Sequence, residues 1–266
     1  PKLIDPSRQI LIQIDIEPRN ASWTFPAEQT LIGDAREIMA ELATRVRASA
    51  GYGFAGARRA AEAHREHASF DDPACLSDGV PIAPQRVIKE LHRVLPDDAV
   101  VACDAGENRM FMMRYFRTKT FMEYLQPSGV GGMGYAIPAA LAAKLVYPER
   151  VAVAVCGDGG FGISMNGMMT ARDENIPIVT VVFNNGILGW VRHGQGDRPM
   201  ASSFAAYDYA AVARAMGCDG VRVEKPTDLA GVLASSIASG RPTVVDVVTA
   251  GSLPFRDGTA TPARRP

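Results

Sequence analysis

Short apolar runs punctuate the second half of the chain. The runs Ala99–Cys103, Val151–Cys156 and Ile178–Phe183 consist almost entirely of aliphatic or other apolar residues. Runs of this length and composition are typical of strands buried on both faces of a parallel sheet. Further strands are predicted at residues 221–223 and 243–248, and helices at residues 84–94, 133–146, 165–174, 207–216 and 227–238. This alternation predicts one doubly wound α/β domain over residues 82–250, with a mostly parallel sheet and helices on both faces.

The first 81 residues follow a different pattern. The apolar stretches Ile10–Asp15 and Thr30–Gly33 predict two strands, and Asp34 is suited to cap an amphipathic helix that ends near Arg47. Two strands and one helix cannot close a hydrophobic core by themselves. We therefore interpret residues 1–47 as the end of another α/β domain, residues 48–81 as a linker around a short helix, and residues 251–266 as a tail that is either disordered or a lid.

Composition narrows the classes of function. The chain of 266 residues is 47% hydrophobic and has 28 basic against 29 acidic residues, so no strongly basic face is indicated and nucleic acid is not expected as a partner. No apolar stretch is long enough to cross a bilayer, and no secretory signal precedes the first strand. The cysteines are widely spaced, which is typical of reduced thiols in a cytoplasmic protein; they are Cys75, Cys103, Cys156 and Cys218.

Two polar side chains follow the most apolar predicted strands. Asp158 comes just after the run 151–156, and Asn185 comes just after the run 178–183. Because parallel strands end at one edge of a sheet, both side chains are expected to face one crevice. A carboxylate, an amide oxygen and a backbone carbonyl are sufficient for Mg²⁺ when a diphosphate supplies further oxygens. Gly159 and Gly160 leave main-chain N–H groups open to phosphate.

Each motif alone has a simpler interpretation. Gly157-Asp158-Gly159 is also an ordinary turn, and Asn184-Asn185-Gly186 is also a tight loop. Their order, each after a buried strand, favours a joint metal and diphosphate site.

These motifs resemble the thiamine-diphosphate signature of the acetolactate synthase and pyruvate oxidase superfamily. The resemblance lies in the block from Gly157 to Asn185, with Thr170-Ala171 and Ile176-Pro177-Ile178 between its ends. The segment 82–88 is similar to the opening of that family's diphosphate-binding domain, and the segment 129–140 to its loop against the pyrimidine ring of the cofactor. The chain is thus identified with the carboxyl-terminal portion of such enzymes.

The resemblance implies a role for individual residues. Asp158, the Asn185 side chain and the Ile187 carbonyl are expected to bind Mg²⁺. The Gly131 carbonyl is expected to accept from the pyrimidine amino group. Met133 is expected to lie under the bent cofactor, although a methionine at the start of a helix is also a common core residue. The remaining residues expected at the cofactor are Gly106, Glu107, Asn108, Gly157, Gly159, Gly160, Leu188 and Gly189.

The chain departs from the family's pattern at two places. Many relatives have Gln-His where this chain has Glu107-Asn108, and a carboxylate beside phosphate oxygens is unfavourable. Acetolactate synthases commonly have Gln-Trp at the positions that His193-Gly194 occupy in this chain. This difference leaves open whether the reaction is acetolactate synthesis. His193 is a candidate acid or base, or else a surface histidine. Trp190 and Arg192 are expected to line the site, with a core position as the alternative for Trp190.

The activity implied by the resemblance is C–C bond cleavage or ligation of a 2-oxo acid or related carbonyl compound, with thiamine diphosphate and Mg²⁺ as cofactors. In the family, the glutamate that activates the cofactor belongs to a pyrimidine-binding domain that this sequence does not resemble. That domain is expected on another chain or in a missing amino-terminal segment, within a homo- or hetero-oligomeric dimer or tetramer. The isolated chain is therefore predicted to be inactive. Residues 1–47 are similar to the end of the family's central domain, in which some members bind FAD or ADP.

Two alternatives stay open at this stage. One is a 2-hydroxyacyl-CoA lyase or an enzyme similar to oxalyl-CoA decarboxylase, in which Arg256, Arg264 and Arg265 of the tail meet a CoA phosphate. The other is a non-catalytic subunit that holds the cofactor without its activating glutamate.

Overall fold

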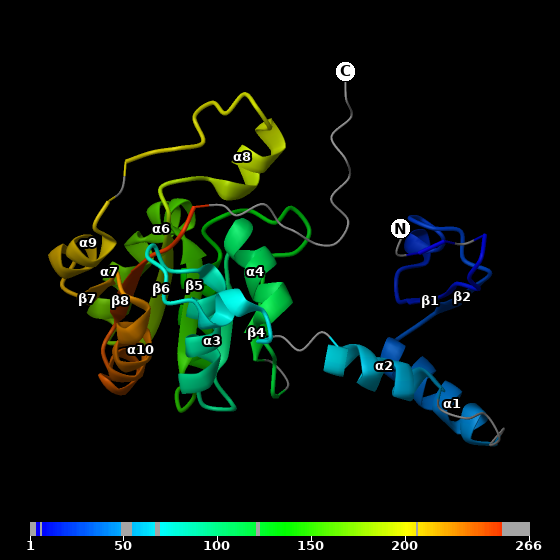
Figure 1. Cartoon of the computed structure of the whole chain (residues 1–266). Helices are drawn as coiled ribbons and strands as arrows, with labels where there is room; N and C mark the ends of the chain where they lie inside the picture. The colour runs from blue at the N-terminus through cyan, green and yellow to red at the C-terminus, as the bar shows by residue number, and fades with distance from the viewer. Residues whose placement is uncertain are drawn as a thin grey trace. The chain divides into compact units, whose positions relative to one another are not determined.

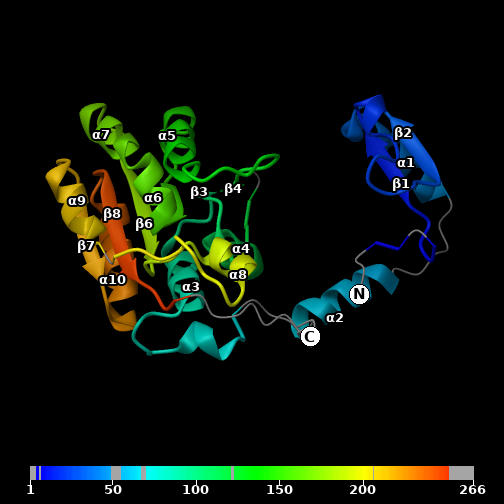
Figure 2. The same ribbon diagram turned by 90° about the horizontal axis from the view of Figure 1, so that it is seen from above.

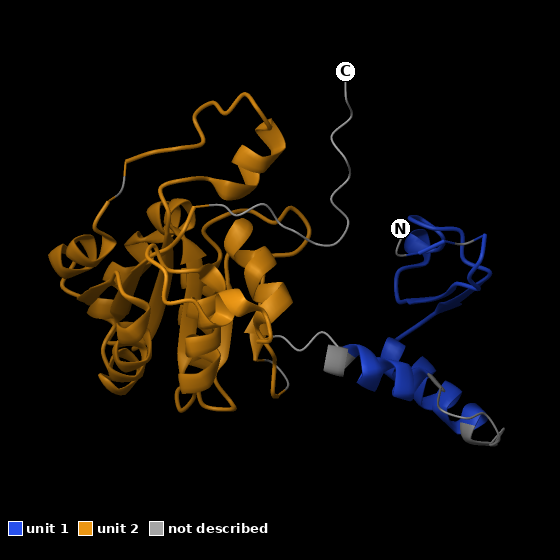
Figure 3. Cartoon of the chain, in the orientation of Figure 1, with its two compact units in different colours: residues 1–66, 256–266 blue, residues 67–255 orange. Residues whose placement is uncertain are grey.

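The chain divides into two compact units (Figure 3). A computed structural model describes residues 4–5, 7–48, 55–66, 70–120, 123–205 and 207–251. Unit 1 comprises residues 1–66 and 256–266, and unit 2 comprises residues 67–255. The domain boundaries proposed from the sequence remain a prediction.

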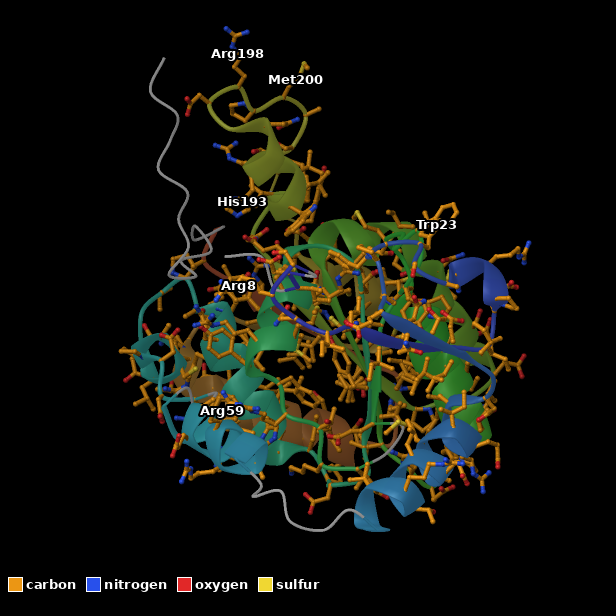
Figure 4. The ribbon with its side chains drawn as sticks, turned by 90° about the vertical axis from the view of Figure 1, so that its right-hand side faces the viewer. Arg8, Trp23, Arg59, His193, Arg198 and Met200 are labelled. Carbon is orange, nitrogen blue, oxygen red and sulfur yellow. The ribbon has the colours of Figure 1, made fainter. Side chains whose placement is uncertain are left out.

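Unit 1 contains a small two-stranded sheet and two helices. Strands β1 (Ile12–Asp15) and β2 (Gln29–Ile32) pair in parallel, and the helices are α1 (Ala35–Ala48) and α2 (Ala55–Glu66), with a 3-10 turn at Pro18–Asn20. The Asp34 carboxylate accepts the main-chain N–H of Arg36 over 2.8 Å, as expected of a residue before a helix. None of the described side chains of unit 1 is buried, and Trp23 is 83% exposed (Figure 4).

Unit 2 is built on a six-stranded parallel sheet (Figure 1). The order of its strands is β4-β3-β5-β6-β8-β7. Their bounds are β3 (Val100–Cys103), β4 (Tyr124–Leu125), β5 (Ala152–Gly157), β6 (Ile178–Asn184), β7 (Asp219–Val223) and β8 (Thr243–Val248). All residues of β3 and β6 are buried, because helices cover both faces of the sheet.

Helices form a layer on each face of this sheet (Figure 2). One layer consists of α3 (Pro84–Val94), α4 (Glu107–Tyr115) and α10 (Leu229–Ala238), and the other of α5 (Ala136–Val146), α6 (Asp158–Ser164), α7 (Asn166–Asp173) and α9 (Tyr209–Ala215). Each layer encloses its own cluster of buried side chains. The short helix α8 (Gly189–Gln195) stands above the carboxyl-terminal edge, and 3-10 turns occur at Pro73–Leu76 and Pro226–Asp228. The predicted doubly wound α/β fold is confirmed.

Local signals explain several of these bounds. Helix α3 has the predicted limits because proline is favourable in its first turn and Pro96 follows its end. The predicted helix at 165–174 is confirmed as α7 to within one residue at each end, whereas α6, which begins at Asp158 directly after β5, was not predicted. The predicted helix at 133–146 begins only at Ala136, because Gly134 has φ +89° and ends a loop.

The cysteines agree with their prediction as core thiols. All four are free and buried. Burial raises the pKa of Cys103 to about 12 and that of Cys75 to about 11, so both stay protonated at neutral pH. Among the described residues, no helix combines the length and apolar character needed to cross a membrane.

Candidate functional site

A pocket lies where the connections of the sheet change direction. From β3 the chain passes through α4 to β4 at one edge, whereas β5 leads through α6 and α7 to β6 on the other side. The loops after β3 and β5 therefore diverge and leave a crevice at the carboxyl ends of these strands. The pocket is open to solvent. Its walls come from the loops after β3, β5 and β6, together with Met133, Pro84 and Thr249.

Asp158 connects two of these loops. Its Oδ2 atom accepts the main-chain N–H of Asn185 over 2.9 Å and that of Gly186 over 2.7 Å, and its Oδ1 accepts the N–H of Gly159. The register of β5 against β6, with Gly157 opposite Phe183, brings these segments together. Burial raises the pKa of Asp158, and the three N–H donors oppose that shift. The expected meeting of the Asp158 and Asn185 loops is thus found in the structure.

The oxygen atoms suited to a cation lie on these loops. The Asn185 Oδ1 atom accepts the N–H of Ile187 over 3.1 Å, which orients the amide within the turn. Gly186 has φ +69°, a conformation that glycine adopts without strain. In the described part of the chain, no three His, Cys, Asp or Glu side chains form a metal-binding group. The residues present fit Mg²⁺ that takes one carboxylate, one amide and one carbonyl, with phosphate oxygens completing its shell.

Asp104 has a structural role that sequence analysis missed. It follows β3 and is fully buried, and its carboxylate accepts the N–H groups of Ala105, Gly134 and Tyr135 over 2.7, 3.0 and 3.2 Å. The last two donors belong to the loop that carries Gly131 and Met133. The signal available in the sequence was an acidic residue directly after a buried strand, the same signal that identified Asp158.

Glycines keep the walls of the pocket close together. A Cβ atom at Gly159 would lie 2.6 Å from Leu188 Cδ2 and 2.9 Å from Met133 Cε. A Cβ atom at Gly160 would lie 2.4 Å from Asp104 Oδ2. Such distances are far shorter than carbon contacts allow. The glycines are therefore needed for packing between loops as well as for access to the main chain.

Glu107 and His193 face each other across the mouth of the pocket. The His193 Nε2 atom lies 2.9 Å from Glu107 Oε1, joining α8 to the first turn of α4. The Glu107 side chain is 9% exposed and that of His193 is 37% exposed. A Cβ atom at Gly189 would lie 2.2 Å from Glu107 Oε2, so the start of α8 lies directly against this carboxylate. His193 is thus a member of a specific pair, although it does not line the pocket itself.

Asn108 packs behind Glu107. Its Nδ2 donates to the main-chain oxygen of Asp104 over 3.2 Å, and its Oδ1 is the nearest atom to a Cβ placed at Gly106 or Gly157. Gly106 itself has φ +112°, which explains glycine at the turn into α4. Asn108 therefore braces the turns after β3 and β5.

A buried ionic network supports the loop after β6. Asp246 on β8 is fully buried and accepts from Asn184 Nδ2, the Tyr209 N–H and Arg222 over 2.8, 3.1 and 2.7 Å. Burial raises the pKa of Asp246, and Arg222 opposes that shift. Since Asn184 directly precedes Asn185, the network holds the loop at the pocket.

The structure gathers most of the residues expected at the cofactor. Those that line the pocket are Gly106, Glu107, Asn108, Met133, Gly157, Asp158, Gly160, Asn185, Ile187, Leu188 and Gly189. Gly159 borders it through Leu188 and Met133, and Gly131 lies in the adjoining loop, near Arg109. Their roles toward a cofactor remain predictions.

The predictions for Trp190 and Arg192 had different outcomes. Trp190 lines the pocket and is 58% exposed, so the alternative of a core position is wrong. Arg192 is bonded to Ser203 Oγ and does not line the pocket. The lining residues that sequence analysis missed are Pro84, Ala105, Phe111, Phe183, Val191 and Thr249. Most are apolar, and no local pattern separates an apolar wall residue from a core residue.

Comparison with known proteins bears on this site. The profile of the family described as "Thiamine pyrophosphate enzyme, C-terminal TPP binding domain" matches residues 104–247. A thiamine pyrophosphate-containing protein named YdaP from Bacillus subtilis strain 168 is 31% identical over 251 residues, which is 92% of this chain and 43% of that protein. The acetolactate synthase isozyme 3 large subunit of Escherichia coli K12 is 28% identical, over 91% of this chain and 44% of its own length.

A third relative is named for a different activity. The sulfoacetaldehyde acetyltransferase of Castellaniella defragrans is 28% identical, over 97% of this chain and 48% of its own length. The chain therefore spans less than half the length of these curated relatives.

The matched segment begins at Asp104, just after β3, and ends within β8. It contains the loops after β3, β5 and β6, which provide most of the pocket lining. Because this match covers more than half of its residues, the chain belongs to the thiamine pyrophosphate enzyme family and contains that family's C-terminal TPP-binding domain.

Proposed function

We propose that this chain supplies the diphosphate- and Mg²⁺-binding half of an enzyme that cleaves or forms a C–C bond next to the carbonyl of a 2-oxo acid or a related compound. The observation that carries the proposal is the bonding of Asp158 to the Asn185 loop. It unites a carboxylate, an amide oxygen and a nearby carbonyl at one wall of a pocket whose other walls are glycine-rich.

The chain's own residues bind and orient the cofactor. Asp158, the Asn185 side chain and the Ile187 carbonyl would hold Mg²⁺, which would neutralise charge on the diphosphate. The turn at Gly106 opens helix α4, whose first N–H groups and dipole favour an anion. Met133, held next to Gly159, presents an apolar surface to the rings of the cofactor. When bound, thiamine diphosphate supplies the electron sink for the broken or newly formed C–C bond.

The rest of the active site comes from outside this chain. The relatives are more than twice as long as the segment that matches them, which supports a missing pyrimidine-binding domain. We propose that this domain, on a second chain or a preceding segment, completes the site within a dimer or tetramer. The FAD or ADP expectation concerns the domain to which residues 1–47 are assigned, and it stays a prediction.

The cation site is tested by calorimetric titration of thiamine diphosphate with Mg²⁺ and with EDTA. Asp158→Asn is compared with Asp173→Asn, whose carboxylate is exposed and pairs with Arg172. We expect cation-dependent binding by the wild type and by Asp173→Asn, with at least about tenfold weaker binding by Asp158→Asn, because a charged ligand is lost. Equal affinities for the two variants, or binding unaffected by EDTA, contradict the assignment.

The substrate is tested by a panel offered to the chain together with a pyrimidine-binding domain. Pyruvate and glyoxylate represent 2-oxo acids, and sulfoacetaldehyde is included because a relative bears that name. Oxalyl-CoA and 2-hydroxyacyl-CoA compounds represent the alternative in which Arg256, Arg264 and Arg265 meet a CoA phosphate, although these residues lie outside the described residues. Turnover of a 2-oxo acid supports the proposal, whereas cofactor binding without any turnover supports a non-catalytic subunit.

A further inference from the structure

The segment that forms the outer wall of the pocket is closed mainly on itself. Ile187 and Ser203 form an antiparallel bridge, and the Leu188 N–H donates to the Ser202 carbonyl over 2.8 Å. At the far end, the Gln195 side chain bonds twice to the main chain of Met200. These bonds shape the segment 187–203 as a loop with α8 in it, but they do not attach α8 to the body of unit 2.

His193 provides such an attachment. It lies on α8, and its ring reaches Glu107 on α4 over 2.9 Å, between positions 86 residues apart in the sequence. Figure 4 shows His193 at the foot of α8, on the side toward the rest of unit 2, with Arg198 and Met200 at the far tip of the loop. The contact therefore connects α8 to α4, whose Glu107 carboxylate borders the pocket.

The position of Glu107 raises an electrostatic problem. Its carboxylate lies in the first turn of α4 and lines the pocket that we assign to an anionic diphosphate. Two negative groups in one partly buried crevice repel each other. An imidazole N–H directed at Glu107 offsets part of this negative charge, and more of it when the ring is protonated.

We propose that His193 is a positioning residue that offsets the charge of Glu107 and thereby couples the attachment of α8 to binding of the cofactor's diphosphate. The coupling rests on the proposed function, whereas the attachment of α8 by the Glu107–His193 pair does not. The two parts can therefore be tested separately.

The attachment is tested on the full chain without any cofactor, by hydrogen exchange of the α8 amides. We expect His193→Ala to raise their exchange about tenfold, because a hydrogen bond to a charged group is lost. His193→Gln, which keeps an N–H donor, should restore part of the protection. Arg198→Ala, at the exposed tip of the same loop, is the matched control and should leave exchange unchanged. Unaltered exchange in His193→Ala overturns the proposal.

The electrostatic coupling is tested by a double-mutant cycle with thiamine diphosphate, and in parallel with inorganic pyrophosphate, both with Mg²⁺. His193→Ala should weaken binding about tenfold, because it leaves the Glu107 carboxylate without this partner. Glu107→Gln removes the charge and should bind at least as tightly as the wild type. The double variant His193→Ala/Glu107→Gln should return to within about twofold of Glu107→Gln.

The outcomes separate the two proposals. If the double variant is as weak as His193→Ala, His193 does not act through Glu107 and the inference is wrong. If the wild type binds neither probe, the proposed function fails, and the exchange experiment still decides whether the pair attaches α8. A circular dichroism spectrum unchanged from the wild type confirms that each variant is folded.

Discussion

The buried carboxylate of Asp104 accepts a hydrogen bond from the main-chain N–H of Gly134 over 3.0 Å. The two residues are separated by 30 positions and by helix α4 and strand β4. This bond ties the end of β3 to the loop that carries Met133, so that one wall of the pocket depends on a side chain behind it.

We expect Asp104→Asn to lower the free energy of unfolding by roughly 1–3 kcal/mol. An amide has one acceptor oxygen and directs its NH₂ group toward the N–H donors that the carboxylate oxygens satisfy. Urea denaturation measures the change, with Asp98→Asn, at an exposed position, as the control. A loss no greater than that of Asp98→Asn would show that these hydrogen bonds contribute little.

Two glycines of α6 form a matched pair for a packing test. A Cβ atom at Gly160 would lie 2.4 Å from Asp104 Oδ2, whereas one at Gly162 would have no described atom within 4 Å apart from its chain neighbours and the backbone of its own helix. Gly160→Ala should therefore destabilise unit 2 by roughly 1–3 kcal/mol through overpacking. Gly162→Ala should be neutral or stabilise by up to about 1 kcal/mol, because alanine favours a helix. Thermal denaturation of both variants distinguishes them; equal melting temperatures would count against the close contact.

Met133 should affect turnover more than cofactor affinity. It lines the pocket beside Gly159 and is proposed to support the shape of the bound cofactor. In the assembled enzyme, Met133→Ala is expected to lower kcat by roughly tenfold or more, since small misplacements are costly in catalysis, while the Kd for thiamine diphosphate changes much less. Met113→Ala, 57% exposed on α4, is the control. A normal kcat would show that Met133 does not support the shape of the bound cofactor.

The stability of unit 2 should depend on pH through His92. The His92 ring packs against Phe70 and Phe116, with ring centroids 5.2 and 5.6 Å away. Burial lowers the pKa of His92, and the charge of Lys119 adds to this effect. The neutral ring therefore stabilises the fold above the unfolded pKa of about 6.5, and this stabilisation is lost as the pH falls through the lowered folded pKa.

Melting temperatures at pH 7.5 and 5.5 provide the check on His92. The wild type should lose more stability over this interval than His92→Gln, whose side chain does not titrate. The same loss in both proteins would mean that other groups dominate the acid response.

The buried ion pair of Arg222 and Asp246 should contribute more to the free energy of unfolding than an ion pair at the surface. Arg222→Met leaves the fully buried Asp246 without its cation and should cost about 2–4 kcal/mol of unfolding free energy. Arg241→Met, which breaks an exposed pair with Asp219, should cost about 0–1 kcal/mol. Denaturant titration compares the two variants. Similar small losses would indicate that water replaces Arg222 at Asp246.

The amino-acid sequence predicts the buried strands of this chain more accurately than its other elements. The apolar runs after residues 150 and 177 predict β5 and β6 to within a residue, because strands covered on both faces need apolar side chains throughout. The same reasoning placed Asp158 and Asn185 at one edge of the sheet. Helix α4, in contrast, was not predicted, because its apolar and polar residues are mixed around its surface and packing against α3 and β3 decides its form.

The sequence by itself determined the alternating strands and helices, the polar residues at the strand ends and the resemblance to a cofactor-binding family, because each depends on neighbours within a few positions. Only the tertiary structure decided the strand order β4-β3-β5-β6-β8-β7 and the partners of Asp104, Glu107 and Asp246. A hydrogen-bonding side chain selects whichever group the fold brings within about 3 Å, and that choice depends on how distant loops meet.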